Sequence, residues 1–247
     1  MRLLVVSIVS LSLAFSSAWA QVFIINDQQY VDEEGILHVV GEIENNTLVP
    51  LNQIVVTATF YDIHDKILGT MTTESILETI MPEKKGPFDL IFINNVIPQI
   101  YRYSLDIEYK PADHKTESLE ILSSNAKRDM LDNFIISGTI TNHDQRTANS
   151  VVIIATLYDK EGKVVATSKS HTEPEYLKAG GITPFLVSVT DKSQSQKAVD
   201  YSLMVESEEY TAVPEFPLGS GIIMSISVIA YVVFTKRPKS LQQSLFV

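Results

Sequence analysis

The sequence predicts an all-β chain in which two tandem β-sandwich domains precede a C-terminal transmembrane helix. Three observations lead to this prediction. A block of sequence recurs without a gap 97 residues further along the chain, the apolar segments have the composition of short strands, and one uncharged apolar run lies near the C-terminus. Recurrence at a fixed spacing is typical of one small domain that occurs twice.

Identical residues at equivalent positions define the repeat. The first copy contains Gly41, Asn45, Ala58, Thr59, Tyr61, Asp62, Lys66, Thr70, Glu78, Pro87 and Phe88, and the second contains Gly138, Asn142, Ala155, Thr156, Tyr158, Asp159, Lys163, Thr167, Glu175, Pro184 and Phe185. We expect one sandwich over residues 21–110 and the other over 119–208. A short polar linker at 111–118 would connect the two domains closely in series. The register changes by one residue before the last strand, which predicts an insertion around 191–197.

Residues 1–20 have the features of a signal peptide. The apolar stretch from Leu3 to Phe15 follows Arg2, and its 13 residues are too few to span a bilayer comfortably. Ala18 and Ala20 are the small residues that a signal peptidase accepts. We expect cleavage after Ala20, with an uncleaved N-terminal anchor as the alternative.

Apolar runs in each copy predict strands at the short intervals of a β-sandwich. Ile54–Tyr61 and Val152–Tyr158 are rich in β-branched and aromatic residues and lack helical spacing. Their period of two predicts six core residues, which are Val56, Ala58, Phe60, Ile153, Ala155 and Leu157. Further strands are expected near Val22–Ile25, Ile36–Ile43, Ser75–Ile80, Phe88–Ile93 and Tyr101–Tyr109, from Ile67 and Val164 onward, and near Leu119–Leu122, Phe134–Ile140, Tyr176–Leu177, Phe185–Val189 and Tyr201–Val205.

A polar turn follows each central strand, beginning at Asp62 in the first copy and at Asp159 in the second. We expect these aspartates to cap their turns, because an Asp side chain bonds readily to the backbone two residues on. Gly162, and Asp65 at the equivalent place, suit the positive φ of such a hairpin.

An apolar run without charge, residues 218–234, is the expected transmembrane helix. It would be roughly 25 Å long at ~1.5 Å per residue, which is near the lower limit for a ~30 Å hydrocarbon core. Lys236 and Arg237 follow at once and favour a cytoplasmic tail at 235–247. We therefore expect a single-pass protein of the cell membrane that contacts lipid through this helix. A stalk at 209–217 would hold both sandwiches outside, and a buried core helix is the alternative.

Charge and composition exclude several classes of function. Residues 21–213 contain 29 acidic and 15 basic residues, a formal net charge of −14. Such a surface repels phosphates, and no basic patch is interleaved with aromatic residues, so nucleic acid is excluded as a partner. The absence of cysteine excludes disulfides, thiolate metal sites and cysteine nucleophiles.

No catalytic, cofactor-binding or metal-ligating set of residues is predicted. The histidines, at positions 38, 64, 114, 143 and 171, are scattered without the short spacings of a metal site. His64 shares a turn with Asp62 and Asp65, but the second copy does not repeat this group. The adjacent Tyr61 and Asp62, like their counterparts Tyr158 and Asp159, face opposite ways on a strand and cannot converge on one substrate atom without a bulge.

Asn45 begins the sequon Asn45-Asn46-Thr47, in a turn that we expect outside the membrane. Glycan attachment to Asn45 is therefore a hypothesis. Its repeat partner Asn142 does not begin a sequon, which indicates that the shared asparagine serves the turn first.

The repeated motif resembles a known domain family. Gly-x-Ile-x-Asn is followed in each copy by Ala-Thr-Phe-Tyr-Asp or Ala-Thr-Leu-Tyr-Asp, and then by Lys-Ile-Leu-Gly or Lys-Val-Val-Ala. These patterns, over roughly residues 36–110 and 134–207, resemble the FxLYD domain, an immunoglobulin-like β-sandwich of exported prokaryotic proteins. The chain departs from the family at Ala58 and Ala155, where the motif begins with an aromatic residue, and at Phe60, where it prefers leucine. The resemblance implies no catalytic residues, so the motif residues Gly41, Tyr61, Asp62, Gly138, Tyr158 and Asp159 are expected to be structural.

The C-terminal region is similar to the PEF-type sorting signals of archaeal surface proteins. Pro214, Glu215, Phe216 and Pro217 precede the apolar run and its basic flank. Such a signal implies recognition by a membrane-embedded sorting enzyme, which can remove the helix. A stiff proline-containing spacer is the alternative, and the chain continues past the basic residues to Val247, unlike most such signals.

Two classes of function follow from the sequence. The first is a non-enzymatic cell-surface module that binds a surface protein or glycan, or that serves as a structural spacer. The second is an extracytoplasmic accessory subunit of a membrane enzyme or transporter complex. The sequence does not identify the ligand.

Overall fold

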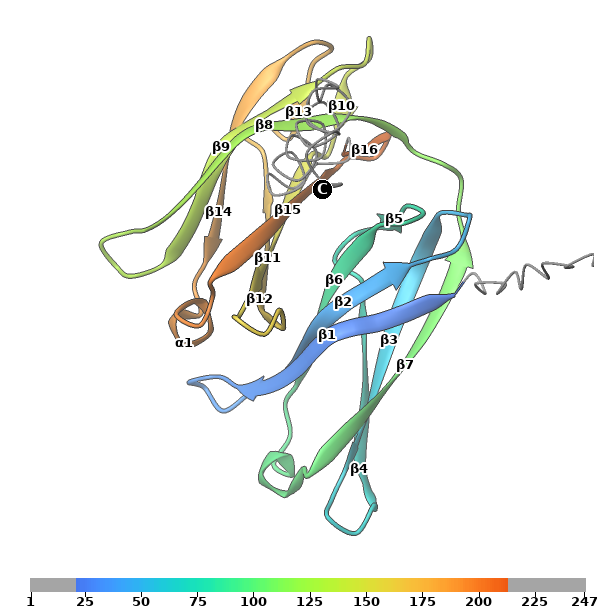
Figure 1. Ribbon diagram of the computed structural model, residues 1–247, viewed down its shortest axis with the longest axis vertical. Coiled ribbons are helices and arrows are strands. Elements are labelled where there is room, and N and C mark those ends of the chain that lie inside the picture. Colours follow the sequence, from blue (N-terminus) through green and yellow to red (C-terminus); the bar gives the residue numbers. More distant parts are fainter. Residues whose placement is uncertain (1–20, 213–247) are drawn as a thin grey trace, which may run out of the picture.

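The computed structural model describes residues 21–212, which are nearly all β with sandwich-like packing (Figure 1). The first copy contains β1 (Val22–Val31), β2 (Leu37–Asn45), β3 (Leu51–Tyr61), β4 (Ile67–Glu74), β5 (Thr79–Ile80), β6 (Lys85–Phe92), the short 3-10 helix η1 (Ile97–Gln99) and β7 (Arg102–Pro111). The second contains β8 (Thr116–Arg128), β9 (Phe134–Asn142), β10 (Ala148–Asn149), β11 (Val152–Tyr158), β12 (Val164–His171), β13 (Tyr176–Leu177), β14 (Ile182–Val189), α1 (Lys192–Ser195), β15 (Asp200–Glu206) and β16 (Tyr210–Ala212).

The first copy consists of two antiparallel sheets, whose counterparts in the second copy are joined into one. In the first copy β1, β2 and β6 form one sheet, while β3 pairs with β4, β5 and β7 in the other. In the second copy β8, β9 and β14 correspond to the first sheet, and β11, β12 and β15 correspond to the second. There β16 joins the two into a single seven-stranded sheet in the order β12-β11-β15-β16-β8-β9-β14.

The structure repeats the backbone of the first copy in the second, in register. Strand pairing places Gly41 opposite Phe88, and the equivalent pair is Gly138 opposite Phe185. Positive φ angles recur at four equivalent pairs of positions, which are Gly35 and Asp132, Gln53 and Ser150, Asp65 and Gly162, and Glu83 and Gly180. The turns are therefore repeated even where the residues differ.

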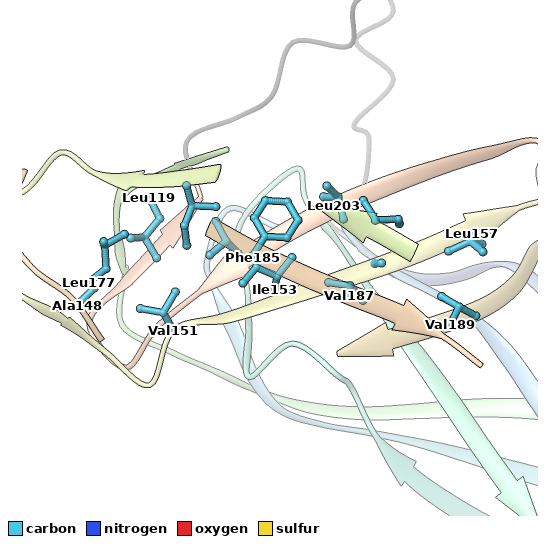
Figure 2. Close-up of a cluster of buried hydrophobic side chains, with 14 of the residues drawn as sticks. Leu119, Ala148, Val151, Ile153, Leu157, Leu177, Phe185, Val187, Val189 and Leu203 are labelled. Carbon is cyan, nitrogen blue, oxygen red and sulfur yellow. The ribbon is translucent and has the colours of Figure 1, made fainter. Parts of the chain in front are cut away.

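The predicted core alternation is confirmed. Val56, Ala58, Phe60, Ile153, Ala155 and Leu157 are all fully buried. In the second copy they pack with side chains from the facing sheet, including Phe185 and Val187 (Figure 2). Burial of each large apolar side chain stabilises the fold by about 1.5–3 kcal/mol.

The predicted capping of the turns is also confirmed. Asp62 Oδ1 accepts hydrogen bonds from the backbone N–H groups of His64 at 2.8 Å and Lys66 at 2.9 Å. Asp159 Oδ1 accepts equivalent bonds at 3.0 and 2.9 Å. The bond from the Lys66 N–H, together with that from His64, lowers the pKa of the Asp62 carboxyl.

Two boundaries differ from the prediction. The expected linker at 111–118 is shorter in the structure, where only residues 112–115 lie between strands, because β7 extends through Pro111 and β8 begins at Thr116. The expected stalk at 209–217 begins with β16, whose Tyr210 is fully buried in the second core. Both segments have backbone partners in neighbouring strands, which local composition does not reveal. Of the strand expected at Ser75–Ile80, only Thr79–Ile80 pairs as β5.

Several predicted elements lie outside the described residues. These are the signal peptide with Ala18 and Ala20, the sorting motif from Pro214 to Pro217, and the transmembrane helix at 218–234. Between residues 21 and 212, no helix has both the length and the apolar character that crossing a membrane requires.

Candidate binding surfaces

The motif glycines make room for side chains and backbone of the neighbouring strands in the same sheet. A Cβ on Gly41 would lie 2.8 Å from the Phe88 ring, and a Cβ on Gly138 would lie 2.8 Å from the Phe185 ring. At Gly138 it would also lie 1.9 Å from the carbonyl oxygen of Ser123. These glycines are therefore needed by the fold, as the sequence indicated.

Asn45 and Asn142 each hold together one end of a domain. Asn45 Nδ2 donates to the carbonyls of Val49 and Ile80, both at 2.9 Å, and Asn142 Nδ2 makes the two equivalent bonds. Both side chains are fully buried. Since a glycan attaches through Nδ2, the folded first domain leaves no free site on Asn45, and attachment after folding is disfavoured.

Tyr61 lies on a solvent-facing sheet of the first domain. Its hydroxyl is 3.2 Å from Ser104 Oγ, and the guanidinium of Arg102 lies 4.0 Å from the ring centroid. Arg102 Nε also donates to Asp65 Oδ1 at 2.8 Å. Polar side chains of the first domain itself therefore contact Tyr61 on this face.

Tyr158, the equivalent residue, faces the first domain instead. Its hydroxyl donates to Glu42 Oε1 at 2.7 Å and lies 2.9 Å from Ser202 Oγ. Glu42 is only 1% exposed and also accepts a bond from Asn26 Nδ2 at 2.9 Å. Burial, followed by the negative charge of Glu42, raises the pKa of the Tyr158 phenol.

The contact around Tyr158 is an extended interface between the two domains. Val152 and Ile154, on the same face of β11, pack into the apolar cluster of the first domain, and β12 contacts β1, β2 and β6 (Figure 1). At one side Glu206 Oε1 accepts a bond from the backbone N–H of Glu78 at 2.8 Å, and burial raises the pKa of Glu206. The expectation of two domains connected in series by a linker is therefore wrong, because the second domain packs the outer face of β11 against the first domain.

His38 forms a second polar cluster on the outer side of β2. Its Nδ1 lies 2.9 Å from Asp89 Oδ1, its Nε2 lies 3.4 Å from Asp32 Oδ2, and its ring stacks on Tyr30 with centroids 4.8 Å apart. The bond to Asp89 raises the pKa of His38. This cluster was not predicted from the sequence, because its members are up to 59 positions apart and only Asp32 is repeated in the second copy, as Asp129.

The first domain also has an open groove between β1 and β7. It has a volume of about 370 Å³, and its walls are Val22, Phe23, Ile24, Asp27, Tyr103, Leu105, Asp106 and Ile107. The hydroxyl of Tyr103 donates to Asp27 Oδ2 at 2.6 Å and ties the two strands together. Sequence reasoning missed this groove, because its two walls belong to the first and last strands of the domain.

A second hollow, of about 930 Å³, lies in the second domain beside β9, β12 and β14. It is lined mainly by small polar and apolar residues, with His171 and Glu173 at its border. In the part of the chain that the structure describes, no three His, Cys, Asp or Glu residues come together as a metal site would require.

Comparisons with known proteins leave the family open. No protein-family model matches the sequence, and no curated protein matches it. Among solved structures, it is similar to an exo-chitosanase of Amycolatopsis orientalis, with 11% identity and a TM-score of 0.27 over 77% of this chain and 26% of that one. A red sea bream transglutaminase matches with 11% identity and a TM-score of 0.24 over 78% and 32% of the two chains. The chain thus spans about a third or less of these proteins, and similarities this weak carry no functional argument.

Proposed function

We propose that this chain is a non-enzymatic cell-surface module in which two immunoglobulin-like sandwiches, displayed outside the membrane on one C-terminal anchor, bind a partner on the surface. The observation that carries the proposal is the groove of the first domain. Leu105 and Ile107 are only partly buried there, whereas their counterparts Leu203 and Val205 are 7% and 1% exposed. Core-type side chains that remain accessible in a groove mark interaction sites in soluble domains.

The sequence supports the rest of the proposal. The acidic charge of residues 21–213 suits an exported, soluble surface module, and the apolar run at 218–234 with its basic flank suits a single-pass anchor. The repeated FxLYD-like motif and the PEF-like segment at 214–217 favour an exported prokaryotic surface protein.

Affinity capture from the cell's own membranes tests the proposal. The tagged full-length chain is solubilised in detergent, and its partners and its own intact mass are measured by mass spectrometry. We expect the chain in the membrane fraction, beginning at Gln21, together with a surface protein or glycan. A stoichiometric complex with an enzyme or transporter would support the accessory-subunit alternative, and recovery of the chain from the cytosol would refute both.

A further inference from the structure

The second domain shows how the open side of this sandwich is closed. β16 pairs in parallel with β8, where Tyr210 lies opposite Thr116 and Ala212 opposite Leu119, and it pairs antiparallel with β15 (Figure 1). Tyr210 is fully buried in the core. One short strand with an aromatic residue therefore fills the gap between the first and last strands of that domain.

The first domain lacks this strand within the described residues. Among residues 21–212, β1 pairs only with β2 and β7 pairs only with β3, so each has one edge without a strand partner there. The groove lies between these edges. Its β1 residues 22–24 are equivalent to residues 119–121 of β8, of which only Leu119 lies beside β16. Inside the groove, the bond from Tyr103 to Asp27 has a counterpart in the 3.1 Å contact of Tyr201 Oη with Ser124 Oγ.

We propose that the groove of the first domain takes up an extended strand of a basic partner protein, which adds between β1 and β7 further along these strands than β16 lies between β8 and β15. The proposal rests on the binding function above and names its site and partner. Free backbone N–H and C=O groups on two strand edges supply the hydrogen bonds of such strand addition, and apolar side chains in the groove receive alternate residues of the added strand.

Charge indicates the chemistry of the partner strand. Two carboxylates, Asp27 and Asp106, line the groove, and no basic residue lines it. A strand that alternates apolar or aromatic residues with lysine or arginine would place its apolar side on Leu105 and Ile107 and its cations beside the carboxylates. A second copy of this chain is a poor partner, because its outer part carries a net charge of −14.

Labelled peptides and hydrogen exchange test the proposal on the full-length chain in detergent micelles. The probe is a short peptide that alternates lysine with valine and tyrosine, and its control replaces each lysine by glutamate. We expect the basic peptide to bind at least about tenfold more tightly than the acidic one at physiological salt. Bound peptide should slow amide exchange in β1 and β7 and leave β8 unchanged.

Two charge-reversal variants separate the groove from general attraction to an acidic protein. Asp106→Lys changes the groove, whereas Glu34→Lys makes the same change of net charge on an exposed residue of the turn after β1 that does not line it. We expect Asp106→Lys to weaken binding of the basic peptide about tenfold and Glu34→Lys to weaken it less than about twofold. Leu105→Trp, which fills the groove without changing charge, should also abolish binding.

Equal effects of the two lysine variants, protection outside β1 and β7, or no binding of the basic peptide would each overturn the strand site. The membrane capture distinguishes this failure from failure of the proposed function. If a partner is captured equally by the Asp106→Lys chain, the binding function stands and the groove is not its site. If no partner is captured by the unmodified chain, the binding function itself fails.

Discussion

Replacing the partly buried phenol of Tyr158 tests the contact between the two domains. Tyr158→Phe removes a 2.7 Å hydrogen bond to a carboxylate that is 1% exposed, and Glu42 then keeps one side-chain donor, Asn26. Hydrogen bonds to charged groups contribute about 1.5–3 kcal/mol, so a loss of stability of this size is expected. For a protein of this length it corresponds to a fall in Tm of about 3–12 °C.

The repeat supplies a matched control. Tyr61→Phe removes the same hydroxyl at the equivalent position, but there it contacts only Ser104 at 3.2 Å on a solvent-facing sheet. We expect a loss of no more than about 0.5 kcal/mol. Thermal unfolding of the full-length protein, followed by near-ultraviolet circular dichroism of its tyrosines, measures both, because the one tryptophan lies in the predicted signal peptide. Equal effects of the two substitutions would refute the interface as described.

Three further predictions concern stability. Asn45→Ala and Asn142→Ala should each destabilise the protein by about 2–3 kcal/mol in urea unfolding, because each leaves two carbonyls without a side-chain donor, and unequal losses would contradict the structural repeat. The pKa of His38 is raised in the folded state, so its contribution to the free energy of unfolding is fully present below the ordinary pKa of 6.5 and is lost as the pH rises through the folded pKa. The free energy of unfolding, measured across neutral pH, should therefore decline more steeply with pH in the unmodified chain than in His38→Gln. Gly138→Ala should destabilise by more than about 3 kcal/mol, and Gly41→Ala by clearly less, because only the former places a Cβ against a backbone carbonyl; similar melting temperatures for the two would disprove this.

The strands and their facing were predictable because they depend on residues close in sequence. Alternation of Val56, Ala58 and Phe60 with threonines fixed the buried side of the central strand, and Asp62 fixed the turn after it. Because the same pattern occurs in both copies, each of these predictions rests on two segments of the sequence. Strand ends were less predictable: β8 extends to Arg128, well past the apolar residues that identified it, because its partner β9 continues alongside.

The binding surfaces were not predictable, since they depend on residues far apart in the chain. Tyr158 and Glu42 are separated by 116 positions, and the walls of the groove come from the first and last strands of one domain. The sequence predicts that Tyr210 lies in a proline-containing stalk, whereas the pairing of β16 with β8 and β15 places it in a core.

The sequence by itself determined that one sandwich occurs twice, which side of each central strand is buried, and how the turns are capped, because these properties follow from local alternation and short-range hydrogen bonds. The tertiary structure alone decided that the Tyr61 hydroxyl has an exposed partner, Ser104, while that of its twin Tyr158 bonds to the buried Glu42 of the other domain. It also decided that one sandwich is closed by an added strand while the other is open. The same local motif meets a different environment in each copy, and that environment is set by long-range packing.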